Sequence, residues 1–309
     1  MAAEHIFLPR LVYKKLHPVG RERVKVRATG LAAFMPGVSG DLGYVDVEKY
    51  RLEFVGLIVQ GIRSGRLYLV RPGDILILKG IDEIYCRWHS GPLDRPDDPL
   101  KRIYCLAKTY SGAGYCREHS GSERALYDRC MGGAGELSIH ACKELDKRLQ
   151  GDYTVYLLDY GDVKPKVGSS RTFRWVERIA EQPHIAATRI YRSKSAYDAR
   201  RVESHVASLG LASERPRKKL RKVKLTEAIS RLADVAGRLS DILGYEWERR
   251  VVVIEEGGEM PKVIDLPSLE GKEARLIGYR YGMLLFELEN ELVGIRSGRI
   301  YHETLWYWR

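Results

Sequence analysis

Residues 86–135 hold four of the five cysteines and have almost no apolar periodicity, and this limits how the chain can fold here. A segment that cannot bury a core of its own needs a crosslink or a bound metal ion to hold one structure. Two of its cysteines begin a Cys-x-x-His pair, Cys86 with His89 and Cys116 with His119. This spacing lets a thiolate and an imidazole bind one ion from a single turn.

We therefore expect one structural Zn²⁺ held by Cys105, Cys116 and His119, with either Cys86 or Cys130 as the fourth ligand. Four protein ligands leave no open coordination position, so such an ion would stabilise the fold. Buried free thiols and disulfides are the alternatives. Disulfides remain an alternative because the chain has few amide residues and 30% charged residues. This composition is typical of thermophiles, whose intracellular proteins do contain disulfides.

The rest of the chain predicts an α+β protein with several domains. Short aliphatic and β-branched runs, separated by Gly, Pro and Asp, dominate both ends of the chain. The 309 residues exceed what one ordinary core organises. The expected parts are a β-rich domain (1–85), the cysteine and histidine segment with a helix (86–149), an α/β domain (150–212), a basic linker with an amphipathic helix (213–245) and a β-rich module (246–309).

One octapeptide occurs twice, as GIRSGRLY at 61–68 and as GIRSGRIY at 294–301. Its Ser-Gly pair suits the turn of a β-hairpin, because glycine accepts positive φ. The repeat favours a duplicated β-module. A composite β-domain formed by the two ends of the chain, or chance recurrence of a turn sequence, are the alternatives.

The net charge of +11 favours polyanionic partners, either RNA or DNA, with a ribosome as one form of the RNA partner. The charge is concentrated in RPRKKLRKVK at 215–224, which we interpret as a phosphate-binding arm, although a solvated linker has the same composition.

The chain contains no apolar run of about 18 residues, so we expect no membrane-spanning helix. The first residues have no signal-peptide core, so we expect a cytoplasmic protein. The oligomeric state stays open. The candidate phosphate ligands in the arm are Arg217, Lys218, Lys219, Arg221 and Lys222.

Residues 153–178 read YTVYLLDYGDVKPKVGSSRTFRWVER, which predicts two strands joined by a Gly-Asp turn and a following helix. A second helix near 195–209 carries apolar residues on one face. This layout resembles the GIY-YIG nuclease superfamily, most closely the branch whose second motif reads K-[VI]-G-[ST] followed by Arg. It is also similar to a prokaryotic family in which a cysteine-rich segment precedes a VYL…KVG…RW block.

The resemblance implies roles for individual residues. Tyr156 matches the tyrosine of the first strand, and Gly168 the second-motif glycine, where the family strand turns tightly. Arg174 matches the arginine that binds the scissile phosphate. Glu203 matches the glutamate that holds a divalent ion, for which Mg²⁺ is the expected cofactor. The implied reaction is metal-assisted phosphodiester hydrolysis, with Tyr156, Arg174 and Glu203 as the catalytic set.

The chain departs from the family where a general base is expected, because Lys166 replaces the second-motif tyrosine. Lysine binds phosphate, as does Arg171 after the motif, but lysine is a poor base unless burial lowers its pKa. The first motif also reads Thr-Val-Tyr instead of Gly-Ile-Tyr. We therefore expect a nucleic-acid-binding protein whose nuclease-like domain is degenerate. An active Mg²⁺-dependent endonuclease, a ribosome-binding translation factor and a scaffold with incidental charge are the alternatives.

Each candidate also has a purely structural interpretation. Tyr156 suits a core position on a strand, Arg174 suits a surface ion pair, and Glu203 can pair with Arg200 three residues earlier on one helix. An open groove around Tyr156, Arg174 and Glu203 would favour the enzyme. A Glu203 already held in a salt bridge would favour the binding protein.

Overall fold

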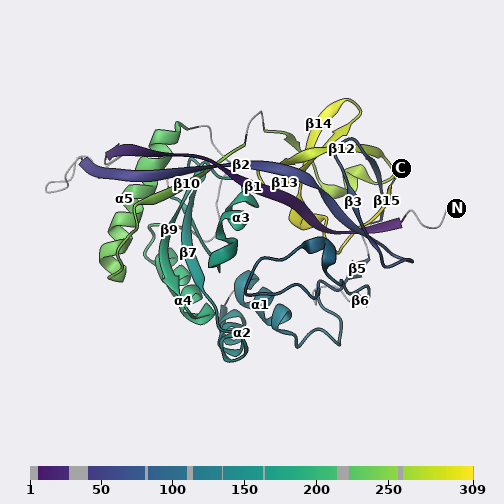
Figure 1. Cartoon of the computed structure of the whole chain (residues 1–309), viewed down its shortest axis with the longest axis horizontal. Helices are drawn as coiled ribbons and strands as arrows, with labels where there is room; N and C mark the ends of the chain where they lie inside the picture. The colour runs from purple at the N-terminus through teal and green to yellow at the C-terminus, as the bar shows by residue number, and fades with distance from the viewer. Residues whose placement is uncertain are drawn as a thin grey trace. The chain divides into compact units, whose positions relative to one another are not determined.

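The computed structural model has mixed α/β structure rich in strands, and it divides into two compact units (Figure 1). Unit 1 joins Met1–Lys15, Leu52–Ala125 and Glu256–Arg309, and unit 2 joins Leu16–Arg51 and Leu126–Glu255. Parts of both predicted β-rich ends therefore lie in the same unit. The structure describes residues 6–27, 41–80, 83–109, 114–133, 135–162, 164–213, 223–256 and 260–308.

The sheet of unit 1 combines strands from both ends of the chain. Its order is β11-β14-β13-β12-β4-β15-β1, with β2 beside β1 and β3 beside β2. Trp306 and Phe286 stack with ring centroids 5.9 Å apart in its core, so the tryptophan-rich end of the chain packs internally. The strands are β1 (Ile6–Arg27), β2 (Asp41–Gly61), β3 (Leu67–Val70), β4 (Ile75–Gly80), β11 (Lys262–Val263), β12 (Glu273–Arg280), β13 (Met283–Leu288), β14 (Glu291–Arg296) and β15 (Leu305–Trp308).

The two copies of the octapeptide fold differently. The first forms the predicted hairpin between β2 and β3, with Gly65 at φ 67° and the Gly61 amide donating to the Arg66 carbonyl at 2.9 Å. The second continues from β14 into a 3₁₀ turn, η5 (Ser297–Arg299). The next strand, β15, pairs with β1 and β4. The hairpin prediction is therefore wrong for the second copy, because tertiary pairing sends this strand elsewhere.

Unit 2 is built on a sheet with the strand order β1-β2-β10-β9-β7-β8. Every residue of β7 is buried, because helices α4 and α5 pack on β7 and β9. A strand covered in this way loses the alternating pattern of a half-exposed strand. The remaining elements are β7 (Tyr153–Asp159), β8 (Lys166–Arg171), β9 (Ala186–Ser193), β10 (Arg250–Glu255), α2 (Gly135–Arg148), η3 (Thr172–Arg174), α3 (Trp175–Ala180), α4 (Ala196–Ser208) and α5 (Leu225–Leu243).

The helix predicted near 195–209 is confirmed as α4 (Ala196–Ser208). The helix α4 begins after Ser195, whose hydroxyl accepts the Asp198 amide at 3.0 Å as an N-cap. The helix α5 ends at Gly244, which adopts φ 62° as a left-handed C-cap. On α2, Ala141 and Leu145 are buried, whereas Leu137 is 85% exposed.

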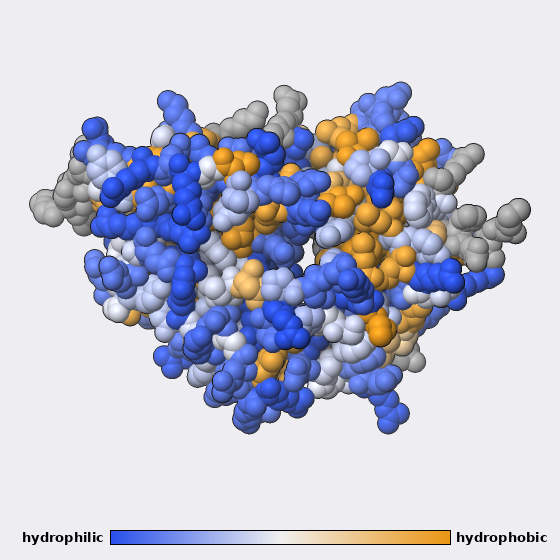
Figure 2. Space-filling view, in the orientation of Figure 1, coloured by the Kyte–Doolittle hydropathy of each residue, from blue (hydrophilic) through white to orange (hydrophobic). Residues whose placement is uncertain are grey.

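The surface in view is mostly hydrophilic over α4 and α5, and hydrophobic residues are more extensive over β12 and β13 (Figure 2). No helix in the described ranges is long and apolar enough to cross a membrane.

Candidate functional site

Four side chains in unit 1 converge to form a cluster that could hold a metal ion. They are Cys86, Cys105, Cys116 and His119, whose ligand atoms all lie within 4.8 Å of one another. The Cys105 and Cys116 sulfurs are 4.0 Å apart, and His119 Nδ1 lies 3.2 Å from Cys116 Sγ and 3.8 Å from Cys86 Sγ. Tetrahedral coordination at Zn–S and Zn–N bond lengths places neighbouring ligand atoms about 3.5–3.8 Å apart, so the cluster is close to that size.

Two short strands and one turn position these ligands. Cys86 comes directly after β5 (Ile84–Tyr85), Cys105 precedes β6 (Lys108–Thr109), and these strands pair antiparallel. Cys116 and His119 share a turn in which the His119 amide donates to the Cys116 carbonyl at 3.1 Å. Two sulfurs also accept backbone amides, Cys86 Sγ at 3.4 Å and Cys105 Sγ at 3.5 Å.

Neighbouring groups orient the His119 ring and change the pKa of the Cys86 thiol. The Trp88 ring stacks on the His119 ring, with centroids 4.2 Å apart and 11° between their planes. Burial raises the pKa of the Cys86 thiol to about 11. A bound divalent cation opposes that effect, because it stabilises the thiolate.

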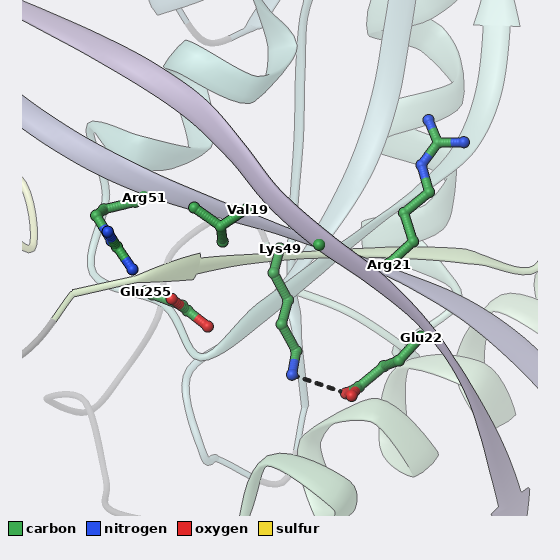
Figure 3. A pocket seen from close by; sticks show the side chains of 7 residues that line it. Val19, Arg21, Glu22, Lys49, Arg51 and Glu255 are labelled. Carbon is green, nitrogen blue, oxygen red and sulfur yellow. Dashed lines mark ion pairs between the residues drawn. The ribbon is translucent and has the colours of Figure 1, made fainter.

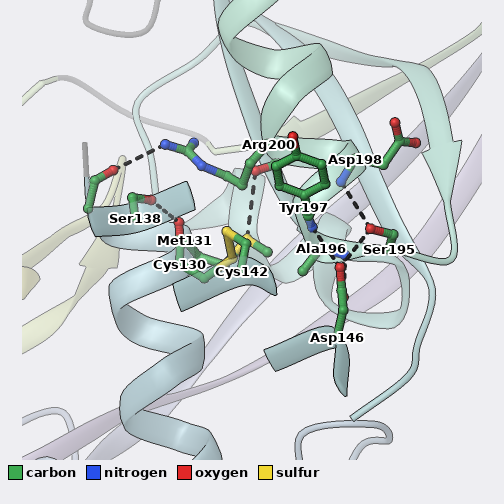
Figure 4. The surroundings of a disulfide bond; sticks show 12 residues. Cys130, Met131, Ser138, Cys142, Asp146, Ser195, Ala196, Tyr197, Asp198 and Arg200 are labelled. Atoms are coloured by element: carbon green, nitrogen blue, oxygen red, sulfur yellow. Dashed lines mark hydrogen bonds between the residues drawn. A yellow bond between two sulfur atoms is a disulfide. The ribbon is translucent and has the colours of Figure 1, made fainter. Parts of the chain in front are cut away.

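The structure decides between the two candidate fourth ligands. Cys130 is bonded to Cys142 in a disulfide that joins α1 (Glu123–Gly132) to α2 (Figure 4). The choice of Cys130 as a metal ligand is therefore wrong, and Cys86 is the fourth member of the cluster. His89 lies outside the cluster, where its Nδ1 accepts the Gly91 amide at 3.1 Å.

Tyr156 and Gly168 face each other in the ladder between β7 and β8 of unit 2. The tyrosine is 2% exposed, and burial raises the pKa of its hydroxyl to about 12. A Cβ atom at Gly168 would lie 2.9 Å from both Cζ and the hydroxyl oxygen of Tyr156. The glycine therefore makes room for the tyrosine ring. It occupies a strand interior instead of the tight turn that the resemblance implied.

A glutamine that was not among the sequence-based candidates joins two of them. Gln182 lies just beyond α3, and its amide nitrogen donates to the Tyr156 hydroxyl at 3.2 Å. Its carbonyl oxygen accepts a short hydrogen bond from Lys166 Nζ. Burial, with Arg178 nearby, lowers the pKa of Lys166 to about 8. The rarity of amides was the available signal, because the chain has only three glutamines.

Glu203 on α4 is already held by neighbouring side chains. It is 6% exposed, and its Oε2 accepts short hydrogen bonds from Ser169 Oγ and Arg200 Nη1. Arg200 Nη2 in turn donates to the Gly133 carbonyl at 3.1 Å. A cation at Oε2 would have to displace or share these two donors.

The two predicted arginines differ in their access to solvent. The Arg174 side chain is 35% exposed and lies 3.6 Å from Glu181 and 3.7 Å from Glu177. Arg171 is 1% exposed, with its guanidinium 4.3 Å over the Tyr153 ring. Its prediction as a phosphate ligand is a poor fit, because the cation–π contact removes the guanidinium from solvent.

The structure thus brings Tyr156, Lys166, Gly168 and Glu203 together around β7, β8 and α4, while Arg171 packs internally. The arm residues Arg217, Lys218, Lys219, Arg221 and Lys222 lie outside the described residues. Comparison with family models, characterised proteins and solved structures finds no match to this chain.

Proposed function

We propose that this protein binds nucleic acid, partly through a cationic row on β1 in unit 2. Arg21, Arg23, Lys25 and Arg27 occupy alternate positions of the strand and are exposed, whereas Val26 is 1% exposed. Alternate residues of a strand point to the same face and lie about 7 Å apart. Four positive charges at this spacing suit a polyanionic backbone, because each neutralised phosphate releases counterions.

Neighbouring side chains leave this row accessible. The Arg21 side chain pairs with Glu48 at 2.7 Å and is still 79% exposed, and the Arg23 guanidinium lies 5.1 Å over the Tyr44 ring. An open pocket next to Arg21 is lined by both cationic and acidic side chains, and in it Lys49 reaches Glu22 at 3.0 Å (Figure 3). Its charged lining residues are Arg21, Glu22, Lys49, Arg51 and Glu255. Charged edge strands also prevent sheets from aggregating, so binding has to be measured directly.

The hydrogen bonds that Glu203 accepts are the observation that favours nucleic-acid binding without cleavage. Its carboxylate is occupied by Ser169 and Arg200, where a nuclease of the implied type needs it for the metal ion. We therefore place nucleic-acid binding first and treat the GIY-YIG-like domain as degenerate. For the cluster of Cys86, Cys105, Cys116 and His119 we propose a structural Zn²⁺, because three thiolates and one imidazole are a ligand set that zinc prefers.

The binding experiment compares two triple charge reversals. Arg23→Glu/Lys25→Glu/Arg27→Glu changes the row, and Lys101→Glu/Lys147→Glu/Lys272→Glu makes the same charge change at dispersed exposed lysines. We expect the row variant to bind labelled RNA and DNA duplexes at least about tenfold more weakly, with a shallower salt dependence. Equal losses in both variants would show that the row has no special part.

A Mg²⁺-dependent endonuclease is the second candidate, and the hydrogen-bonded chain from Lys166 through Gln182 to Tyr156 favours it. A lysine whose pKa is about 8 is partly deprotonated near neutral pH, so it can accept a proton where an ordinary lysine cannot. Incubation with RNA and DNA in Mg²⁺ tests this function. Cleavage that is lost in Lys166→Met and Glu203→Gln would establish the nuclease, whereas cleavage unchanged in both would reveal a contaminant.

The ribosome-bound alternative needs a separate measurement. Co-sedimentation of the tagged chain with ribosomes, in low and high salt, distinguishes it from binding to free RNA or DNA. Retention that survives high salt would favour a specific ribosomal site over counterion release.

A further inference from the structure

One buried arginine of unit 1 has an unusual set of partners. Arg10 on β1 is 3% exposed, and its Nε donates to Gln60 Oε1 at 2.9 Å. Its two terminal nitrogens donate to main-chain carbonyls, Nη1 to Cys86 at 3.0 Å and Nη2 to Cys105 at 2.6 Å. Both carbonyls belong to members of the metal-ligand cluster.

The remaining contacts of Arg10 are also uncharged. Its Nη1 lies 2.9 Å from His302 Nδ1, and its guanidinium lies 5.4 Å from the centre of the Tyr104 ring. Burial, together with Arg10, holds the pKa of His302 well below its usual value, so this imidazole is neutral. Within the described part of the chain, no carboxylate pairs with Arg10. A buried charge without a counterion is costly, and native proteins pair nearly all such charges.

The charge of the proposed metal centre supplies the missing partner. A dication bound by three thiolates and a neutral imidazole carries a net charge of −1. Arg10 contributes +1 next to it, because it bonds to the backbone of two of the ligand residues. With its thiols protonated, the metal-free cluster is neutral and leaves the Arg10 charge without a counterion.

We infer that Arg10 is the built-in counterion of the metal centre and couples metal binding to the packing of β1. This inference rests on the proposed Zn²⁺ at Cys86, Cys105, Cys116 and His119. Through Gln60, which also donates to the Gly65 and Tyr104 carbonyls at 2.9 and 3.4 Å, the same arginine fixes the β2–β3 turn. Arg10 is a positioning residue, since it touches the ligand residues and not the ion.

The test measures Zn²⁺ affinity by chelator competition in the full chain for wild type, Arg10→Gln and Arg10→Lys. We expect Arg10→Gln to bind Zn²⁺ about 10- to 100-fold more weakly, the usual effect of losing a partner of metal ligands. Arg10→Lys keeps the charge and should lose less affinity than Arg10→Gln. The matched control is Arg102→Gln, in the same segment, because Asp97 already balances Arg102 at 2.8 Å.

Thermal unfolding with and without metal separates a counterion from an ordinary packing residue. With Zn²⁺ bound, Arg10→Gln should unfold at a lower temperature than wild type. After chelation Arg10→Gln should lose less stability relative to wild type than it does with Zn²⁺ bound, because the cost of the lost hydrogen bonds is then offset by removal of an uncompensated buried charge. A packing role would instead destabilise both forms equally.

The outcomes also separate this inference from the zinc proposal. A wild-type chain that binds no Zn²⁺ would overturn both. A wild type that binds Zn²⁺ while Arg10→Gln has unchanged affinity would overturn only the counterion role. Equal losses in Arg10→Lys and Arg10→Gln would assign the effect to hydrogen-bond geometry and also overturn it.

Discussion

Gly168→Ala tests whether β8 carries a glycine because the Tyr156 ring lies against it. An alanine Cβ would lie 2.9 Å from Tyr156 Cζ and from its hydroxyl oxygen, and 3.1 Å from Cε2. The ring has little room to move, since it is 2% exposed and Gln182 donates to its hydroxyl. Overpacking of this kind costs about 1–3 kcal/mol. The expected fall in unfolding temperature is about 2–4 °C for each kcal/mol lost.

The control is Gly237→Ala in α5, where an added Cβ meets nothing within 4 Å. Alanine replaces glycine in a helix interior with a gain of about 0.5–1 kcal/mol, so the two variants should shift stability in opposite directions. Calorimetry measures both shifts. The steric cause is isolated by repeating Gly168→Ala in a Tyr156→Leu background, where the penalty should shrink, because contacting residues are not additive.

An unchanged unfolding temperature for Gly168→Ala, alongside the expected rise for Gly237→Ala, would refute this reasoning. A penalty that persists undiminished in the Tyr156→Leu background would refute the steric contact as its cause. Backbone strain is not the source of the penalty, because Gly168 does not have positive φ.

Three further experiments address the metal ion, the disulfide and Glu256. Chelating the metal should lower the unfolding temperature of the wild type in calorimetry, and a scan unchanged by chelation would contradict a structural ion. Cys142→Ser should lower the free energy of unfolding by about 2–4 kcal/mol, because the Cys130–Cys142 bond joins residues 12 apart in the sequence. Denaturant titration of the oxidised wild type and of the variant measures this difference in unfolding free energy. Burial raises the pKa of Glu256 to about 7 in the folded state, so the native protein binds more protons than the unfolded chain between about pH 4.5 and 7. Stability should therefore fall as pH rises through that window, and unfolding of Glu256→Gln across pH should show a smaller fall.

Local sequence patterns located much of the secondary structure and most of the cysteine and histidine cluster. Helices α4 and α5 carry apolar residues at helical spacing, and Gly244 provides a local signal for the end of α5. The Cys-x-x-His spacing likewise placed Cys116 and His119 at one site. These features depend on neighbours a few residues apart, so local patterns are enough to predict them.

The sequence did not predict which distant segments of the chain pair with one another. Cys86 and Cys130 were equal candidates until the tertiary structure placed one beside His119 and bonded the other to Cys142. The two copies of the octapeptide diverge for the same reason, because strand pairing with distant segments decides where the chain goes after each Ser-Gly pair.

The sequence alone determined the strand-rich, mixed α/β composition of this protein, its positive charge and the cysteine and histidine residues of its candidate metal-binding cluster. Only the tertiary structure decided that Glu203 is paired, that Arg171 is buried over Tyr153, and that Arg10 lies against the backbone of Cys86 and Cys105. The physical reason is that burial and charge pairing depend on which side chains meet across the fold, and residues as far apart as Arg10 and Cys105 meet only after folding.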